Sequence, residues 1–286
     1  MYRLIKIKPS SSAKEKSQWA KDLESGKVLF IENFNFKILP EEKKFFTPEI
    51  LLKNSKNISL DLKNNIKGLN LSNDDSKKLI KMISRFRSEA KKLIISTFPK
   101  YKNHIQLAPT SFRPIDVSSR KTSWRADDTK LHIDAFPSRP NYGIRILRVF
   151  INVNPKGDAR LWRIGENINA IAEKYIHKVK PFSPIKAKIL YWLGITKSLR
   201  SEYDHIMLEM HDLMKKDNYY QKRSSQILVP FKPQTVWICF SDQTAHAAMS
   251  GQYMIEQTFY IHPSNQYNSE KSPIEILQKT TGKKLF

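Results

Sequence analysis

Short strand-like segments in the second half of the chain limit its fold more than any other feature. They are rich in Ile, Val, Phe and Tyr, are separated by turn-forming residues, and lie at 129–135, 144–153, 226–231, 235–241 and 253–262. Segments of this length and composition predict β-strands rather than helices. We therefore expect a mainly β protein, a sandwich or barrel of antiparallel strands with helices packed on its outside.

The amino-terminal half has a different pattern. Residues 10–26 are rich in Ser, Lys and Glu and are expected to be loosely ordered, whereas the apolar run 28–31 predicts a first strand. A long helix is predicted after Ser72, because an acidic first turn precedes apolar residues at helical spacing, and Pro99 would end it. The same spacing predicts another helix at about 201–216.

These elements suggest how the chain is organised. At 286 residues one large β-rich domain is possible, and 40% hydrophobic residues suffice for a sizeable core. We expect residues 1–105 to form an amino-terminal segment whose strand and long helix pack on a core formed by residues 106–286. The two parts would make one compact unit.

Composition also restricts the setting and the partners. Cys239 is the only cysteine and lies in an apolar run, which predicts a packed thiol, no internal disulfide and a reducing, cytoplasmic setting. The amino terminus lacks the apolar core of a signal peptide, and no run of about 18 apolar residues occurs, so neither secretion nor a membrane span is expected. The formal charge of +23 would attract nucleic acid, anionic lipid headgroups or acidic sugars.

Two metal-capable side chains, His132 and Asp134, lie two residues apart within a predicted strand. Side chains at this spacing point to the same face of a strand. Among the seven histidines His246 is the best third ligand, because it follows the strand at 235–241 and a polar turn. Two imidazoles and one carboxylate leave three cis positions open on a metal, which is the arrangement of mononuclear non-haem iron(II) oxygenases.

The spacing alone does not establish a metal site. A His-x-Asp triplet would arise by chance in roughly one of three chains with seven histidines. In the alternative interpretation His132 is a strand histidine bonded to a neighbour, and His246 is a turn residue bonded to Asp242 or to the backbone. On the residues alone both interpretations remain open.

Oxygenases of this type commonly use 2-oxoglutarate, whose keto-acid end chelates the metal while its far carboxylate needs a cation, ideally arginine. Arg145 and Arg148 are three residues apart on one predicted strand, so they must face opposite sides of it. We favour Arg148, because Phe150 and Asn152 would share its face and could line a pocket. Further candidates for polar contact with the co-substrate are Arg160 and Gln257.

Longer strings of residues resemble the Kdo 3-hydroxylase family, the iron(II)- and 2-oxoglutarate-dependent group that acts on the Kdo sugar of lipid A precursors. The resemblance runs from about residue 110 to residue 261. It rests on LHIDAFPSRP at 131–140, ILRVF at 146–150 with NVNP at 152–155, WRIGE at 162–166, YDH at 203–205, and FSDQTAH at 240–246 with MSGQY at 249–253. Strings this long are far more specific than the three candidate ligands alone.

The resemblance implies a double-stranded β-helix core of the jelly-roll, cupin-like type, with His132, Asp134 and His246 as metal ligands. It implies Fe(II), 2-oxoglutarate and dioxygen as cofactors and co-substrates, and hydroxylation of carbon 3 of Kdo in Kdo-lipid A to give Ko, with release of succinate and carbon dioxide. One departure from the commonest oxygenase pattern is that no Arg or Lys lies between His246 and Lys271. This absence strengthens the case for Arg148 as the co-substrate cation.

A substrate bearing carboxylates would also need a cationic rim. Candidate substrate-binding arginines precede and follow the metal-binding segment, although each could equally be only a surface charge: Arg113, Arg120, Arg125, Arg139 and Arg163. Residues 178–200 interleave lysines with aromatic and aliphatic residues, a mixture suited to peripheral contact with the anionic inner-membrane surface. The equally weighted alternative is a helix that packs Ile189, Leu190 and Leu193 into the core.

Two other functions remain possible at this point. The charge would also suit an iron and 2-oxoglutarate oxygenase acting on nucleic acid, but the chain lacks the downstream pair of arginines usual in such enzymes, so no nucleic-acid partner is expected. The other is a non-enzymatic sugar- or lipid-binding β sandwich with structural histidines. We favour a glycolipid substrate, Kdo-bearing lipid A or a related anionic glycolipid.

Overall fold

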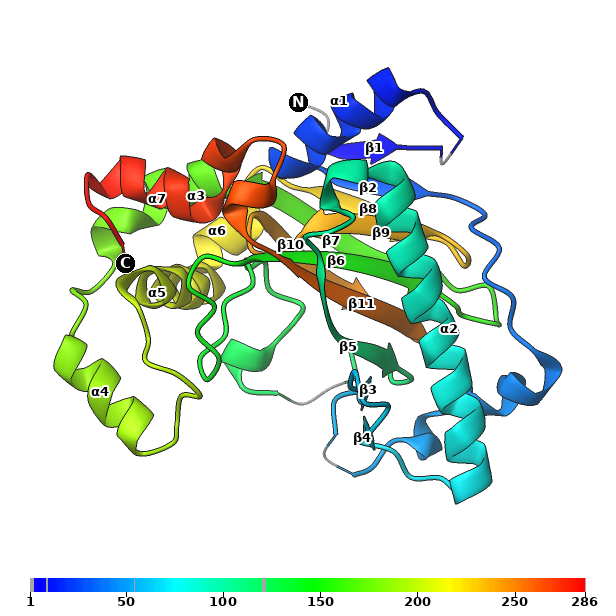
Figure 1. The fold of residues 1–286 in the computed structure, drawn as a ribbon. Coiled ribbons are helices and arrows are strands. Elements are labelled where there is room, and N and C mark those ends of the chain that lie inside the picture. The colour runs from blue at the N-terminus through cyan, green and yellow to red at the C-terminus, as the bar shows by residue number, and fades with distance from the viewer. Residues whose placement is uncertain (1–2, 9, 54, 120–121, 286) are drawn as a thin grey trace.

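Two β-sheets that pack face to face form the centre of the molecule (Figure 1). The computed structural model describes residues 3–8, 10–53, 55–119 and 122–285. The large sheet has eight strands in the order β1-β2-β9-β6-β11-β5-β3-β4, and the small sheet has three in the order β10-β7-β8. The strands are β1 Leu4–Lys6, β2 Val28–Ile31, β3 Ile58–Leu60, β4 Ile66–Lys67, β5 Gln106–Arg113, β6 Arg145–Asn152, β7 Arg160–Asn167, β8 Ile227–Phe231, β9 Val236–Phe240, β10 Thr244–Ser250 and β11 Met254–Ile261.

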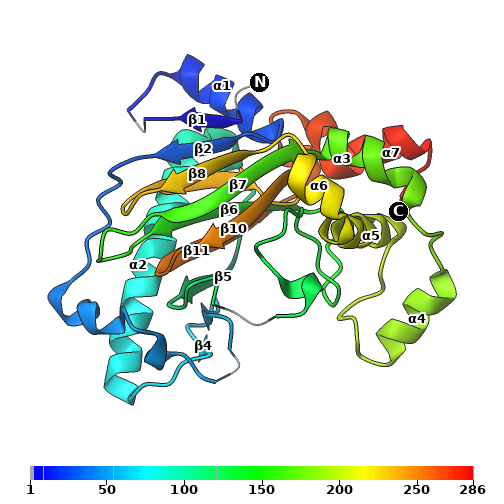
Figure 2. The ribbon, with the colours of Figure 1, turned by 180° about the vertical axis from the view of Figure 1, so that it is seen from behind.

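Helices flank this sandwich on one face and at one end, as Figures 1 and 2 show from opposite sides. The long helix α2 crosses the outer face of the large sheet, while α3, α5, α6 and α7 gather at one end of the strands. The α-helices of the described residues are α1 Ala13–Glu24, α2 Asn73–Thr97, α3 Ile168–Tyr175, α4 Pro184–Trp192, α5 Glu202–Lys216, α6 Asn218–Arg223 and α7 Pro273–Thr281. The mainly β fold with flanking helices and a jelly-roll core is confirmed.

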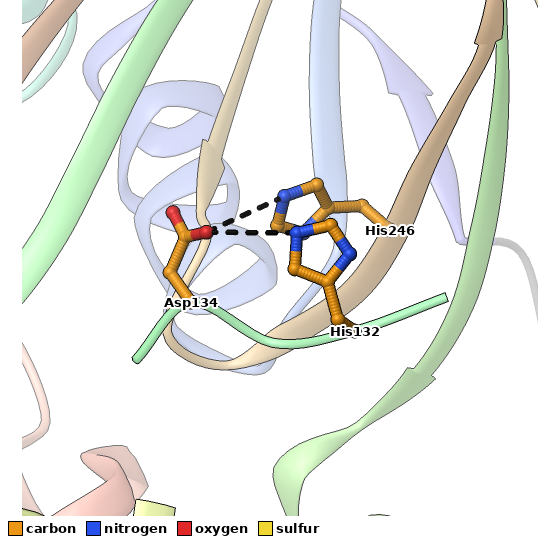
Figure 3. A group of neighbouring side chains, drawn as sticks. All are labelled: His132, Asp134 and His246. Carbon is orange, nitrogen blue, oxygen red and sulfur yellow. Dashed lines mark ion pairs between the residues drawn. The ribbon is translucent and has the colours of Figure 1, made fainter. Parts of the chain in front are cut away.

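The prediction of a strand at 129–135 is wrong. This segment is coil, and Figure 3 shows it as a thin trace from which His132 and Asp134 project. An Asx turn at Asp127, whose carboxylate accepts from the backbone and hydroxyl of Thr129, bends the chain before a full strand can form. One isolated bridge, between His132 and His246, ties the segment to β10.

The opening segment is also better ordered than expected, because residues 13–24 form helix α1. Ser12 caps it: its hydroxyl accepts from the backbone of Glu15, and the Glu15 carboxylate accepts from the backbone of Ser12. This capping box satisfies two backbone donors that the helix itself leaves unpaired. Trp19 and Leu23 of α1 are buried in the core.

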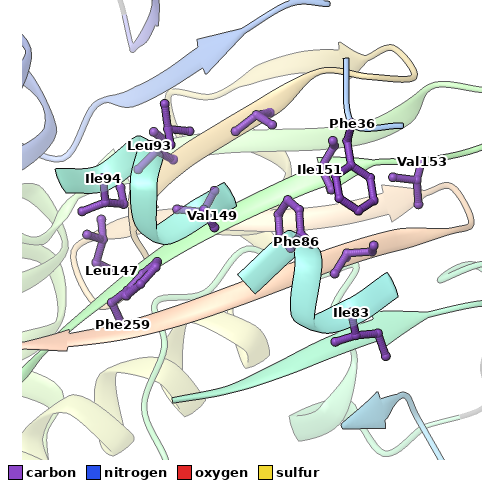
Figure 4. Close-up of a cluster of buried hydrophobic side chains, with 14 of the residues drawn as sticks. Phe36, Ile83, Phe86, Leu93, Ile94, Leu147, Val149, Ile151, Val153 and Phe259 are labelled. Atoms are coloured by element: carbon purple, nitrogen blue, oxygen red, sulfur yellow. The ribbon is translucent and has the colours of Figure 1, made fainter. Parts of the chain in front are cut away.

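The predicted long helix is confirmed as α2, which Ser72 caps and which ends just before Pro99. Its buried face packs on the outer side of β6 and β11 (Figure 4). Helical spacing on α2 and alternation along the strands decide which side chains meet there. The side chains that meet there include Ile83, Phe86, Leu93 and Ile94 from α2, and Leu147, Val149, Ile151 and Phe259 from the sheet. This apolar layer covers the outer face of the large sheet, so the inner face is free to line the pocket between the two sheets.

The large sheet runs across the expected boundary at residue 105. Strands β1 to β4 come from the first 105 residues, and β3 pairs with β5 beyond that point. The division into an amino-terminal segment and a core therefore stays a prediction.

Helix α4 stands away from the sheets (Figures 1 and 2). The alternative in which this region packs into the core is wrong, because Ile189 and Leu193 are 51% and 56% exposed. Leu190 is half-buried, and Ala187 is the buried residue of the helix. No helix in the described part of the chain is long and apolar enough to cross a membrane.

Candidate metal centre

His132, Asp134 and His246 converge between the two sheets (Figure 3). Each offers one ligand atom, and these three atoms lie within 4.8 Å of one another. Asp134 Oδ1 is 3.8 Å from His132 Nε2 and 3.9 Å from His246 Nε2. One ion could contact all three groups, and the set of two imidazoles and one carboxylate is the one that iron(II) oxygenases use.

The backbone holds both imidazole rings in position. His132 and His246 exchange two backbone hydrogen bonds of 3.1 and 2.9 Å, which place their rings side by side. His132 Nδ1 donates to the carbonyl of Lys130 at 2.7 Å, and His246 Nδ1 donates to the carbonyl of Thr244 at 2.9 Å. Because a donating Nδ1 leaves Nε2 as the lone-pair atom, both histidines present a metal-binding nitrogen to Asp134.

The charges of the three groups also suit a cation. Burial, and then the neighbouring His246, lower the pKa of His132 well below its usual range, and burial lowers the pKa of His246. Burial would raise the pKa of Asp134, but Arg148 and the two histidines together lower it below its usual range. At neutral pH the site therefore offers two neutral imidazoles and an ionised carboxylate, which is the protonation state that a metal requires.

A pocket opens beside these ligands and reaches across the sandwich. It has about 400 Å³ of space between its walls, the open mouth included. Its apolar walls come from both sheets, and the Trp162 ring stacks on His246 with ring centres 5.3 Å apart. Its charged walls come from Arg113, Arg148, Arg160, Asp128, Asp134 and Glu256. The pocket thus combines a metal-ligand set with three guanidinium groups.

Arg148 joins the metal ligands to the rest of the pocket. Its guanidinium lies 2.8 Å from Asp134 Oδ2 and 2.7 Å from Glu256 Oε1, and Arg113 lies 3.0 Å from the other Glu256 oxygen. Burial would raise the pKa of Glu256, but Arg148 and Arg113 lower it. The result is a buried chain of alternating charges that holds Arg148 in one orientation.

Arg145, Asn152 and Gln257 are not among the residues that line this pocket. Arg145 lies on the opposite face of β6, where it pairs with Asp242 at 2.7 Å. Asn152 shares the face of Arg148 but binds the carbonyls of Asp158 and Phe231 at the end of the strand. Gln257 is buried on the outer face of the large sheet, away from the pocket, where it binds Thr110 and the carbonyl of Ala108.

Replacing Arg145 with methionine should lower the free energy of unfolding by about 3–5 kcal/mol, because a buried Asp242 would lose its partner. Burial already raises the pKa of Asp242 against the opposing effect of Arg145. Urea denaturation would measure the change, with Arg139→Met, at an exposed arginine, as the matched control. An unchanged unfolding midpoint in the Arg145 variant would contradict a structural role for this ion pair.

The expected cationic rim is only partly assembled around the site. Arg113 lines the pocket, whereas Arg120 falls outside the described residues. Arg125 pairs with Asp212 and has a side chain that is 60% exposed, and Arg139 is exposed. Arg163 binds the carbonyls of Thr129 and Gln221 and so braces the metal-binding coil.

Sequence reasoning missed three residues that shape the pocket: Asp128, Trp162 and Glu256. Glu256 could be found only from the register between β11 and β6. That register pairs Glu256 with Phe150 of β6 and places it beside Arg148. Trp162 lies on β7, which pairs with β10 so that His246 faces Ile164 and Ala248 faces Trp162. Neither register follows from the spacing of residues along the chain.

A jelly-roll core with two histidines and one carboxylate converging beside an arginine-lined pocket defines a mononuclear non-haem iron dioxygenase. The chain belongs to the family described as 3-deoxy-D-manno-oct-2-ulosonic acid (Kdo) hydroxylase, whose model matches residues 6–284. A search of the curated proteins gives no match.

Solved structures agree with this assignment. The apo structure of the Kdo hydroxylase KdoO, a non-heme Fe(II) alphaketoglutarate dependent dioxygenase, is similar to this chain with 41% identity and a TM-score of 0.94, covering 99% of this chain and 97% of that one. Its complex with cobalt(II) matches at 40% identity and a TM-score of 0.95, and its complex with alphaketoglutarate and Fe(III) at 40% and 0.94, both with the same coverage. The prediction of an iron(II)- and 2-oxoglutarate-dependent dioxygenase of the Kdo hydroxylase family is confirmed, which sets the non-enzymatic alternative aside.

Proposed function

We propose that this enzyme hydroxylates carbon 3 of Kdo while the sugar is attached to lipid A or a related anionic glycolipid, and that the product is Ko. The family description names a 3-deoxy sugar, so carbon 3 is the ring position that lacks a hydroxyl group. The observation that carries the proposal is the convergence of His132, Asp134 and His246 beside an arginine-lined pocket. Bound iron would supply dioxygen activation coupled to conversion of 2-oxoglutarate to succinate and carbon dioxide.

The charges of the pocket support a dianionic co-substrate. Its three arginines are matched by three carboxylates, and the two histidines are neutral, so the walls are close to electrically balanced. An iron(II) ion would therefore bring two uncompensated positive charges. The two carboxylates of 2-oxoglutarate would balance them, because buried charges are tolerated only when paired.

We propose that Arg148 binds the far carboxylate of 2-oxoglutarate, with Arg160 as a second contact. Both line the pocket with the metal ligands, and Glu256 fixes the direction in which Arg148 points. Arg113 would bind a further carboxylate, that of the co-substrate or of Kdo. Trp162 and Phe150 would exclude water from the reacting atoms and keep these ion pairs strong.

The proposed place of action is the cytoplasmic face of the inner membrane, with the enzyme bound peripherally. Cys239 is a buried free thiol, which agrees with a reducing compartment. The formal charge of +23 favours a surface of anionic lipid, where a lipid-linked Kdo would be met.

Incubation with iron(II), 2-oxoglutarate and Kdo-bearing lipid A should add one oxygen atom to the glycolipid and release one succinate per product. A substrate carrying two deuterium atoms at carbon 3 would locate the reaction, because hydroxylation there must replace one of them. Mass spectrometry reads both changes at once, and omission of 2-oxoglutarate is the control. Oxygen gain with both deuterium atoms retained would contradict carbon 3 as the site.

A further inference from the structure

The region around α4 displays large apolar side chains to solvent. Trp192 is 85% exposed and Ile185 73%, and exposed apolar side chains continue along the helix and the loop after it. The other members of this set are Ile189, Tyr191, Leu193, Ile195 and Leu199. A folded protein rarely leaves so many apolar groups together on its surface unless they meet a partner.

The same region is positively charged. Residues 180–200 contain Lys180, Lys186, Lys188, Lys197 and Arg200, and their sequence includes no Asp or Glu. All four lysines are exposed. Apolar and aromatic side chains interspersed with lysines, on a segment whose sequence carries no acidic residue, match the interface of an anionic bilayer. There the apolar groups enter between headgroups and the lysines meet phosphates.

The region is tied to the active site rather than loosely tethered. The backbone of Lys197 donates to the carbonyl of Ser138 at 2.8 Å, and Arg200 donates to the carbonyl of Pro137. Residues 137 and 138 follow Asp134 within one short coil. On the other side, His205 of α5 binds the carbonyl of Lys180 at 2.7 Å. A surface held at both ends in this way can set the distance between a bilayer and the metal-binding coil.

We propose that residues 180–200 are the surface through which the enzyme docks on an anionic phospholipid bilayer, with Ile185, Trp192 and Leu193 inserted among the headgroups. The proposal rests on the proposed lipid-linked substrate, and it names the surface that brings the enzyme to it. Charge complementarity favours the bilayer over a second copy of the chain, because two such cationic surfaces would repel each other.

Sedimentation with phosphatidylcholine vesicles, with and without phosphatidylglycerol, tests the docking directly. The wild-type enzyme should bind only the anionic vesicles and should release at high salt. The double variant Ile185→Ser/Trp192→Ser should bind at least about tenfold more weakly, since two large apolar groups no longer leave water. Lys186→Gln/Lys188→Gln should weaken binding to the anionic vesicles about fivefold for each positive charge removed.

Tyr219→Ser/Leu228→Ser is the matched control, because these side chains are 77% and 62% exposed and lie outside the region. Equal loss of binding in this control, no binding by the wild type, or equal binding to uncharged vesicles would overturn the proposal. A dimer in gel filtration that the Ile185/Trp192 variant abolishes would identify a second copy as the occupant and overturn it as well.

Activity separates this proposal from the proposed function. On Kdo-lipid A embedded in vesicles the Ile185/Trp192 variant should be slow, and on the same Kdo units freed of lipid it should match the wild type. If the wild type oxidises neither substrate, the proposed function fails while the vesicle binding still decides the docking. If the variant is equally slow on both substrates, the surface has no docking role.

Discussion

Replacing His246 with glutamine is expected to abolish stoichiometric iron(II) binding and, with it, hydroxylation. His246 supplies one of the three ligand atoms, and no fourth His, Cys, Asp or Glu of the described residues joins this cluster. Removing a mere partner of a metal ligand typically costs 10–100-fold in metal affinity, so losing a ligand should cost more than about 100-fold. Iron titration and succinate release measure the two effects.

Glutamine is chosen because it keeps much of the volume that packs against Trp162. His177→Gln, at an exposed histidine outside the pocket, is the matched control and should behave as the wild type. Thermal unfolding without metal should differ little between the two variants. A His246 variant that still binds one iron and turns over would show that the metal lies elsewhere.

The elements that could be predicted from sequence are those whose burial follows from local spacing. Helix α2 has its apolar face at helical intervals and a capping serine, β9 is a continuous apolar run, and β6 is rich in Ile, Leu, Val and Phe. Strand β7 was missed because its buried positions include Arg160, and β10 because His246 lies among small residues with low strand preference. Such strands form because their neighbours in the sheet cover them, which a single segment does not reveal.

The same reasoning explains how much of the site could be predicted. Alternation correctly separated Arg148 from Arg145, since it depends only on the strand period. It also placed Asn152 on the face of Arg148, but there the Asn152 amide binds the carbonyls of Asp158 and Phe231 and does not line the pocket. Glu256, which holds Arg148, comes from a strand more than a hundred residues away in the chain, so only the register of β11 against β6 reveals it.

Replacing Arg148 with methionine is expected to raise the KM for 2-oxoglutarate by about 30-fold or more, which corresponds to about 2 kcal/mol. The side chain is 13% exposed and sits between two carboxylates, so the co-substrate would lose a charge-assisted contact in a buried place. Arg148→Lys should recover only part of the affinity, because an ammonium group cannot form the paired contacts of a guanidinium. Initial rates at varied 2-oxoglutarate measure KM, and Arg139→Met is the control.

Arg148 also contacts Asp134, so a purely structural role must be separated from co-substrate binding. If Arg148 only orients the metal ligand, the methionine variant should lose iron affinity and leave the KM for 2-oxoglutarate unchanged at saturating iron. If it binds the co-substrate, KM should rise even when iron saturates the enzyme. A second variant, Glu256→Gln, sharpens the distinction: it frees Arg148 from one partner while keeping the guanidinium, so it should raise KM less than Arg148→Met does. An unchanged KM in the Arg148 variant would show that Arg160 or Arg113, which line the same pocket, binds the far carboxylate of 2-oxoglutarate instead.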